Sequence, residues 1–152
     1  MPIASSGIQS AVSNVCDLLP TIADVTGISL PPDHPLDGES LATLLSGKKD
    51  HSRDGVFVMH FPHEHRTNYF SVLRAGKYKL AYHYFPGEDS GDKRYQLFDL
   101  ESDPFEQNDL AEHNPAMLSN LLVKLRTELD HYGAQFPVGE SGPIQIELNR
   151  SP

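Results

Sequence analysis

The most concentrated set of chemically active side chains is a group of three histidines, His60, His63 and His65, within six residues. Neutral imidazoles with Glu64 nearby are suitable zinc ligands, although the spacing matches no closed zinc set and further ligands would have to come from elsewhere. Imidazole N–H groups, with Arg66 adjacent, can also donate hydrogen bonds to sulfate or carboxylate oxygens. A third interpretation is surface loop histidines with one turned into the core. Residue types and spacing leave these interpretations open.

Other candidates for chemistry have simpler explanations. Cys16 is the only cysteine, and the neighbouring carboxylate of Asp17 opposes ionisation of its thiol, which indicates a structural residue. Three acids could form a cluster for acid–base chemistry or calcium, but turn formation explains them and their spacing fails the calcium-loop pattern: Glu101, Asp103 and Glu106. The sequence has no Gly-rich phosphate loop, G-x-S-x-G, H-E-x-x-H or C-x-x-C motif. We therefore predict no catalytic residue and no metal site in this chain.

The charge distribution limits the classes of partner. The net charge of −9 argues against nucleic acid and against a membrane surface, and no stretch approaches the roughly 20 apolar residues that span a bilayer. Acids dominate residues 1–47 and 95–152, whereas residues 48–94 carry nine Lys and Arg against six acids, together with five of the eight histidines. An anionic small molecule would therefore bind in the middle third, unless these bases simply lie along exposed strand faces.

Helical patterns come first in the chain. Asp17 is expected to cap a helix with Pro20 in its first turn and Gly27 at its end. The apolar face of that helix comprises Leu18, Leu19, Ile22 and Val25. A second short helix, closed by Gly47, should point three leucines inward: Leu41, Leu44 and Leu45.

From Gly55 the apolar period changes to two, which predicts four antiparallel strands near residues 56–61, 69–74, 77–84 and 95–100, with a hairpin turn at Gly76. Asn114 and Pro115 then begin a long helix that runs to about Tyr132. Its apolar stripe consists of Leu118, Leu121, Leu122, Leu125 and Leu129. Such a stripe needs a sheet to cover, so we predict an α+β fold in which a four-stranded antiparallel sheet packs against this helix. Residues 138–152 should form a loosely ordered tail.

Several segments, taken in order, resemble the C-terminal part of sulfatases, the sulfuric ester hydrolases of the alkaline phosphatase superfamily. The matching segments are residues 12–27, 36–41, 60–63, 74–80, 95–100 with 103–104, 108–111 and 133–137. Each motif alone is weak, but the ordered set covers most of the chain. The resemblance implies that residues 1–137 are the C-terminal subdomain of a larger enzyme.

The resemblance also implies a division of labour. Sulfatases hydrolyse sulfate esters with a formylglycine, made in a C-x-P-x-R or S-x-P-x-R motif, and with a divalent cation such as calcium or magnesium. Neither that motif nor an acidic metal set occurs here, so the partner would be a missing N-terminal catalytic domain. His60 and His63 match a stretch that borders the substrate pocket in related enzymes, and with His65 and Arg66 they form the predicted substrate-binding set. The substrate would be a sulfated small molecule or glycan.

Two alternatives remain open at this point. The chain could be a stand-alone module that binds acidic or sulfated sugars through its basic middle third. It could also come from a phosphodiesterase or phosphonate hydrolase of the same superfamily. A subdomain taken from a larger enzyme is further expected to expose an apolar patch where it met its partner.

Overall fold

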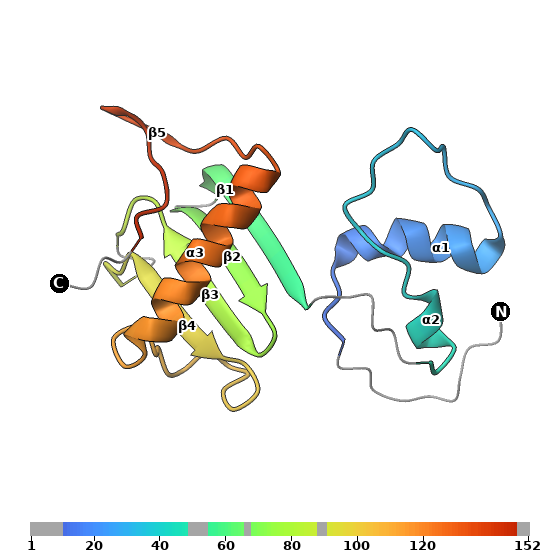
Figure 1. Ribbon diagram of the computed structural model, residues 1–152, viewed down its shortest axis with the longest axis horizontal. Helices are drawn as coiled ribbons and strands as arrows, with labels where there is room; N and C mark the ends of the chain where they lie inside the picture. The colour runs from blue at the N-terminus through green and yellow to red at the C-terminus, as the bar shows by residue number, and fades with distance from the viewer. Residues whose placement is uncertain (1–10, 49–54, 66–67, 88–90, 149–152) are drawn as a thin grey trace. The chain divides into compact units, whose positions relative to one another are not determined.

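The computed structural model describes residues 11–48, 55–65, 68–87 and 91–148. Contacts between Cα atoms divide the chain into two compact units, Met1–Gly55 and Val56–Pro152, which we call unit 1 and unit 2. In Figure 1, unit 1 carries α1 and α2, and unit 2 carries the sheet and α3. The boundary between the two units, at Gly55, lies inside the predicted C-terminal subdomain of residues 1–137. The extent of that subdomain therefore stays a prediction. None of the helices in the described ranges has the length and apolar character needed to cross a bilayer.

Unit 2 is built on a four-stranded antiparallel sheet with the strand order β1-β2-β3-β4. Its strands are β1 Val56–His65, β2 Asn68–Ala75, β3 Tyr78–His83 and β4 Tyr95–Asp99. Gly76 turns between β2 and β3 with a φ of +57°, which glycine adopts without strain. The predicted strands and turn are confirmed. However, β1 continues past its predicted end at Phe61, and the irregular register between Phe61 and His65 accommodates Pro62.

The helix α3, Pro115–His131, lies across one face of this sheet (Figure 1). Its start is the predicted one, because the side chain of Asn114 accepts a hydrogen bond from the Met117 N–H at 3.2 Å and Pro115 lies in the first turn. All five predicted leucines of α3 are buried: Leu118, Leu121, Leu122, Leu125 and Leu129. They pack in one core with buried residues of the sheet, including Leu73, Leu80, Tyr82 and Leu97. The α+β fold is therefore confirmed.

The chain returns along this core after α3. Two short strands, β5 Val138–Gly139 and β6 Gly142–Pro143, pair with each other. Ile146 is only 3% exposed and belongs to the core, and the phenol of Tyr95 donates a hydrogen bond to the carbonyl oxygen of Glu147 at 3.3 Å. The loose order expected for residues 138–152 stays a prediction, and residues 149–152 lie outside the described part.

Unit 1 contains the 3-10 turn η1 Val15–Asp17 and the helices α1 Leu18–Thr26 and α2 Ala42–Leu45. As predicted, α1 ends at Gly27, which has a φ of +73°. The predicted capping role of Asp17 is wrong, because its carboxylate makes no cap bond to α1. That carboxylate instead accepts hydrogen bonds from the backbone N–H groups of Asn14 and Glu39, at 2.8 and 2.9 Å.

The described residues of unit 1 do not cover the apolar face of α1. Three of its members are at least half exposed: Leu18, Leu19 and Ile22. The opposite side of the helix, with Thr21 and Ala23, is buried instead. In α2, Leu44 is buried as predicted, but Leu45 is 37% exposed because adjacent positions point about 100° apart around a helix.

The segment 38–42 lies against the polar side of α1. The backbone N–H of Leu41 donates to the hydroxyl of Thr21 at 2.8 Å, and the hydroxyl of Ser40 donates to the carboxylate of Asp24 at 2.8 Å. At Gly38 the two backbones approach so closely that a Cβ atom would overlap the carbonyl group of Cys16. Glycine at this position therefore allows the contact.

Gly38→Ala should loosen unit 1. The added Cβ must displace the backbone around Cys16, which disrupts the neighbouring Asp17–Glu39 hydrogen bond at a cost of about 1 to 3 kcal/mol. Hydrogen exchange should show faster exchange of the Glu39 and Leu41 amides. The control is Gly87→Ala, whose Cβ would meet nothing within 4 Å. Unchanged exchange in Gly38→Ala would contradict this account.

Candidate functional site

The residues predicted to bind substrate lie near the end of β1. His60 pairs with Ser71 of β2 in regular register, and the irregularity follows between Phe61 and His65. The backbone of His65 pairs with Asn68. The side chain of His65 and the whole of Arg66 lie outside the described part of the chain. Of the four predicted substrate-binding side chains, the structure therefore describes those of His60 and His63.

Both ring nitrogens of His60 are engaged by unit 2. Nδ1 lies 2.7 Å from the hydroxyl oxygen of Ser71, and Nε2 lies 2.8 Å from the main-chain carbonyl oxygen of Gln135, which follows α3. Because a carbonyl oxygen only accepts hydrogen bonds, Nε2 is assigned the proton. The ring also meets the rings of Tyr84 and Phe136 edge-on, with centroid distances of 6.0 and 5.8 Å. His60 thus ties β1 to the segment beyond α3.

The hydrogen bonds continue inward from His60 to Ser71 and Tyr84. In the neutral imidazole, Nδ1 accepts from the Ser71 hydroxyl, whose oxygen lies 2.8 Å from the phenol oxygen of Tyr84 and accepts from it in turn. Ser71 and Tyr84 are 0% and 1% exposed. Burial raises the pKa of Tyr84 to about 12, so the phenol remains a donor even above pH 10, where an exposed tyrosine begins to lose its proton. We call His60, Ser71, Tyr84 and the Gln135 carbonyl the histidine network.

His63 has different surroundings. It is exposed, and its ring meets the ring of Phe61 with a centroid distance of 6.2 Å. Phe61 in turn packs against Phe70 of β2 at 4.9 Å. None of these rings takes part in the contacts described for His60. The structure therefore brings His60 and His63 onto one strand but gives them different neighbours, one set in the histidine network and one around Phe61.

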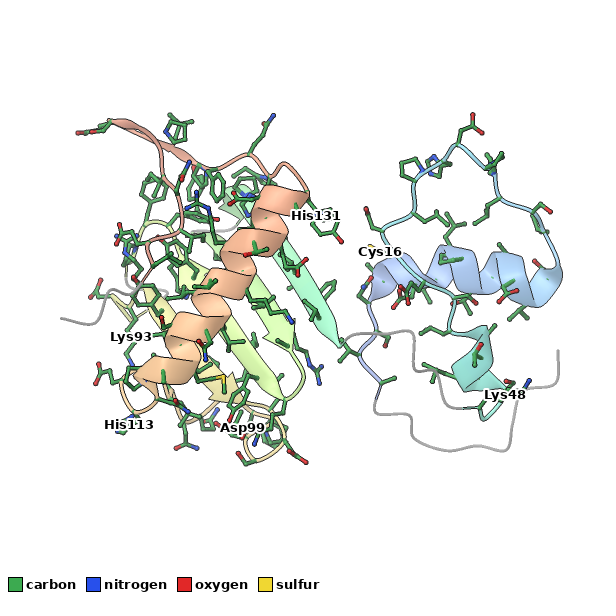
Figure 2. All side chains as sticks on the ribbon, viewed as in Figure 1. Cys16, Lys48, Lys93, Asp99, His113 and His131 are labelled. Carbon is green, nitrogen blue, oxygen red and sulfur yellow. The ribbon has the colours of Figure 1, made fainter. Side chains whose placement is uncertain are left out.

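Much of the positive charge of the middle third is paired with acids of the last third. Among the described residues, these ion pairs are Lys77–Asp99 at 2.7 Å, Lys79–Glu106 at 2.6 Å, Lys93–Asp109 at 2.8 Å and Arg94–Glu147 at 3.7 Å. The ammonium group of Lys77 holds the pKa of the Asp99 carboxyl below its usual value. Figure 2 labels Lys93 and Asp99 among these residues. The basic segment therefore supplies fewer unpaired cations for an anion than the sequence alone suggests.

The described residues do not fit a divalent cation. Across the described ranges, no three His, Cys, Asp or Glu side chains lie close enough together to hold one. In the acidic turn, Asp103 accepts a hydrogen bond from the backbone N–H of Asn108 at 2.7 Å, and Glu106 pairs with Lys79. These contacts support turn formation over calcium binding. Cys16 is exposed and carries a free thiol.

Sequence reasoning missed Ser71, Tyr84 and Gln135. Ser71 had a readable signal, because the alternation of β2 places it on the core face with Tyr69 and Leu73, where a polar residue needs a hydrogen-bond partner. Gln135 had none, because only its main-chain carbonyl takes part.

Comparison with known proteins places the chain in a family. The family described as "N-sulphoglucosamine sulphohydrolase, C-terminal" matches residues 3–135, most of the chain. The chain belongs to this sulfatase family. The predicted resemblance to the C-terminal part of sulfatases is therefore confirmed.

Sulfatases of known sequence resemble the chain over most of its length. Arylsulfatase K of Mus musculus is 35% identical over 84% of this chain and 23% of its own length. The choline-sulfatase of Rhizobium meliloti is 34% identical over 74% and 20%, and the Delta 4,5-hexuronate-2-O-sulfatase of Bacteroides thetaiotaomicron is 33% identical over 76% and 22%. The chain thus spans about a fifth to a quarter of the length of these relatives.

Solved structures share the fold. A 2-O GAG sulfatase superposes with a TM-score of 0.54 and 30% identity, over 76% of this chain and 23% of that protein. A protein solved in complex with its substrate D-glucosamine-2-N,6-O-disulfate superposes with a TM-score of 0.58 over 77% and 24%. At 22% identity, the second comparison supports the fold alone.

The pH dependence of stability should report the buried phenol of Tyr84. Its pKa is raised to about 12, so between pH 10 and 12 the unfolded chain loses this proton while the folded chain keeps it. Stability therefore falls as pH rises through this window, by up to about 2 kcal/mol. Urea unfolding from pH 9 to 11 should show a shallower fall for Tyr84→Phe than for the wild type.

The control for this prediction is Tyr132→Phe, because the Tyr132 side chain is 74% exposed in the folded protein. It should retain the wild-type slope. Parallel slopes for the wild type and Tyr84→Phe would show that the phenol does not stay protonated as described.

Proposed function

We propose that this chain is the C-terminal part of a sulfatase that hydrolyses sulfate esters, and that it contributes to the wall of the substrate pocket without supplying the nucleophile or the metal site. The family match over residues 3–135, in a chain without a nucleophile motif, carries this proposal. The formylglycine and the calcium or magnesium ion implied by the resemblance would belong to the N-terminal catalytic domain. No catalytic step is therefore assigned to a residue of this chain.

The pocket wall in this proposal is the end of β1. It comprises the predicted substrate-binding set, His60, His63, His65 and Arg66. The exposure of His63 supports a direct role, because its imidazole N–H is available to a substrate oxygen. Both ring nitrogens of His60 are engaged within unit 2, which supports a positioning role for that residue. His60 would hold the base of the wall while His63 touches the substrate.

The reacting group in this proposal is a sulfate ester on a small molecule or glycan. Two relatives are named choline-sulfatase and Delta 4,5-hexuronate-2-O-sulfatase. Both names specify a sulfatase, but they specify different organic groups that carry the sulfate. This supports a common sulfate chemistry with an organic part that varies. Selection of that organic part is the task we assign to the wall.

Activity measurements separate this proposal from the binding-module alternative. The 152-residue chain should not hydrolyse an aryl sulfate with calcium or magnesium present, whereas the complete enzyme should. Metal-dependent turnover by the chain alone would refute the proposal. Specific, salt-sensitive binding of a sulfated oligosaccharide by the chain alone, abolished by His63→Ala, would instead favour a stand-alone module.

In the complete enzyme, His63→Ala should raise KM about tenfold with little change in kcat, because the lost contact is made equally in the ground state and the transition state. The matched control is His113→Ala, an exposed histidine just before α3 (Figure 2). The control should leave both constants unchanged. An unaltered KM for His63→Ala would remove this residue from the proposed wall.

A further inference from the structure

The helix α1 exposes the side that a helix normally buries. Apolar side chains of the turn η1 and of α1 recur at positions i, i+3, i+4 and i+7, the spacing of a stripe that faces a core. These residues, which we call the apolar stripe, are Val15, Leu18, Leu19 and Ile22, with exposed fractions of 77, 53, 50 and 58%. A contiguous exposed apolar patch of this kind marks a contact surface.

The other side of α1 is fixed by polar contacts and cannot be exchanged for the stripe. The Asp17 carboxylate binds the Glu39 N–H, the Thr21 hydroxyl binds the Leu41 N–H, and the Asp24 carboxylate binds the Ser40 hydroxyl, all between 2.8 and 2.9 Å. Rotation of the helix to bury the stripe inside unit 1 would break all three bonds. With these bonds in place, only a surface outside the described part of unit 1 can cover the stripe.

The described part of unit 1 also has no core of its own against which the stripe could pack. Its buried apolar side chains are few, and most of them are small: Pro20, Ala23, Ala42 and Leu44. Unit 2, by contrast, has the complete core formed between α3 and the sheet. The described part of unit 1 therefore resembles a surface layer that packs on the apolar core of another part of the protein.

The size of the stripe argues against a second copy of the chain as that support. Four aliphatic side chains bury about 400 Å² at most, at about 100 Å² each, whereas a stable interface buries about 800 Å² per partner. A contact within one polypeptide needs less area, because it does not lose translational and rotational freedom on association. The relatives are four to five times longer than the matched part, and the matched family is described as C-terminal.

We infer that the apolar stripe packs on an apolar surface of the catalytic part of the same sulfatase, so that unit 1 forms an outer layer of that part. This inference rests on the proposed function. The four side chains carry no charge and no hydrogen-bonding group, so the surface that covers them is hydrocarbon, as on the face of a core sheet or helix. The C-terminal subdomain proper then corresponds to unit 2.

Thiol labelling tests the inference. In a Cys16→Ser background, Ile22→Cys places a thiol in the stripe and Lys124→Cys places one on the exposed side of α3. Maleimide labelling of the Ile22→Cys thiol should be at least tenfold slower, to order of magnitude, in the complete enzyme than in the 152-residue chain, because local opening must precede reaction. The Lys124→Cys thiol should react at similar rates in both proteins. Leu19→Cys repeats the measurement if Ile22→Cys fails to fold.

Several outcomes would overturn the inference. Equal labelling of the stripe in both proteins would show that the catalytic part does not cover it. Slow labelling in the 152-residue chain that accelerates on dilution would show that a second copy covers it. Aryl sulfate turnover, measured on the same preparations, separates the two proposals. Turnover with fast stripe labelling refutes only this inference, and slow labelling without turnover refutes only the proposed function.

Discussion

Burial of one row of leucines from α3 against the sheet is the contact on which unit 2 depends. Leu122 and Leu125 are completely buried, as are Leu80 and Leu97 on the strands opposite them. Because α3 lies against β2 and β3, the segment that follows it also comes alongside β1. In this arrangement His60 can form its hydrogen bond to the Gln135 carbonyl, which lies four residues beyond the end of α3.

Most of this architecture could be predicted because local periodicity carries it. The leucine spacing of α3, the alternation of the four strands and the turn at Gly76 are each determined by neighbours within a few residues. Helix α1 was also located by its pattern, but its orientation was not. Which side of α1 faces inward depends on the bonds from Asp17 and Thr21 to residues about 20 positions away.

The candidate site was predictable in composition and less so in arrangement. Histidines near the end of a strand are visible in the sequence, and the family resemblance pointed to the same residues. The sequence did not show that His60 is hydrogen-bonded within unit 2 while His63 is exposed. This difference depends on the Gln135 carbonyl, which lies 75 residues from His60 in the sequence. The lysine charges were likewise readable, but their pairing with Asp99, Glu106 and Asp109 required the fold.

The partner of His60 beyond α3 is a main-chain carbonyl, and this has a consequence for evolution. Any amino acid at position 135 presents the same oxygen, so exchange of that residue leaves the bond in place. Position 135 can therefore drift without a compensating change at position 60. An analysis of covariation between homologous sequences would therefore not detect the contact between positions 60 and 135, although this contact joins β1 to the segment after α3.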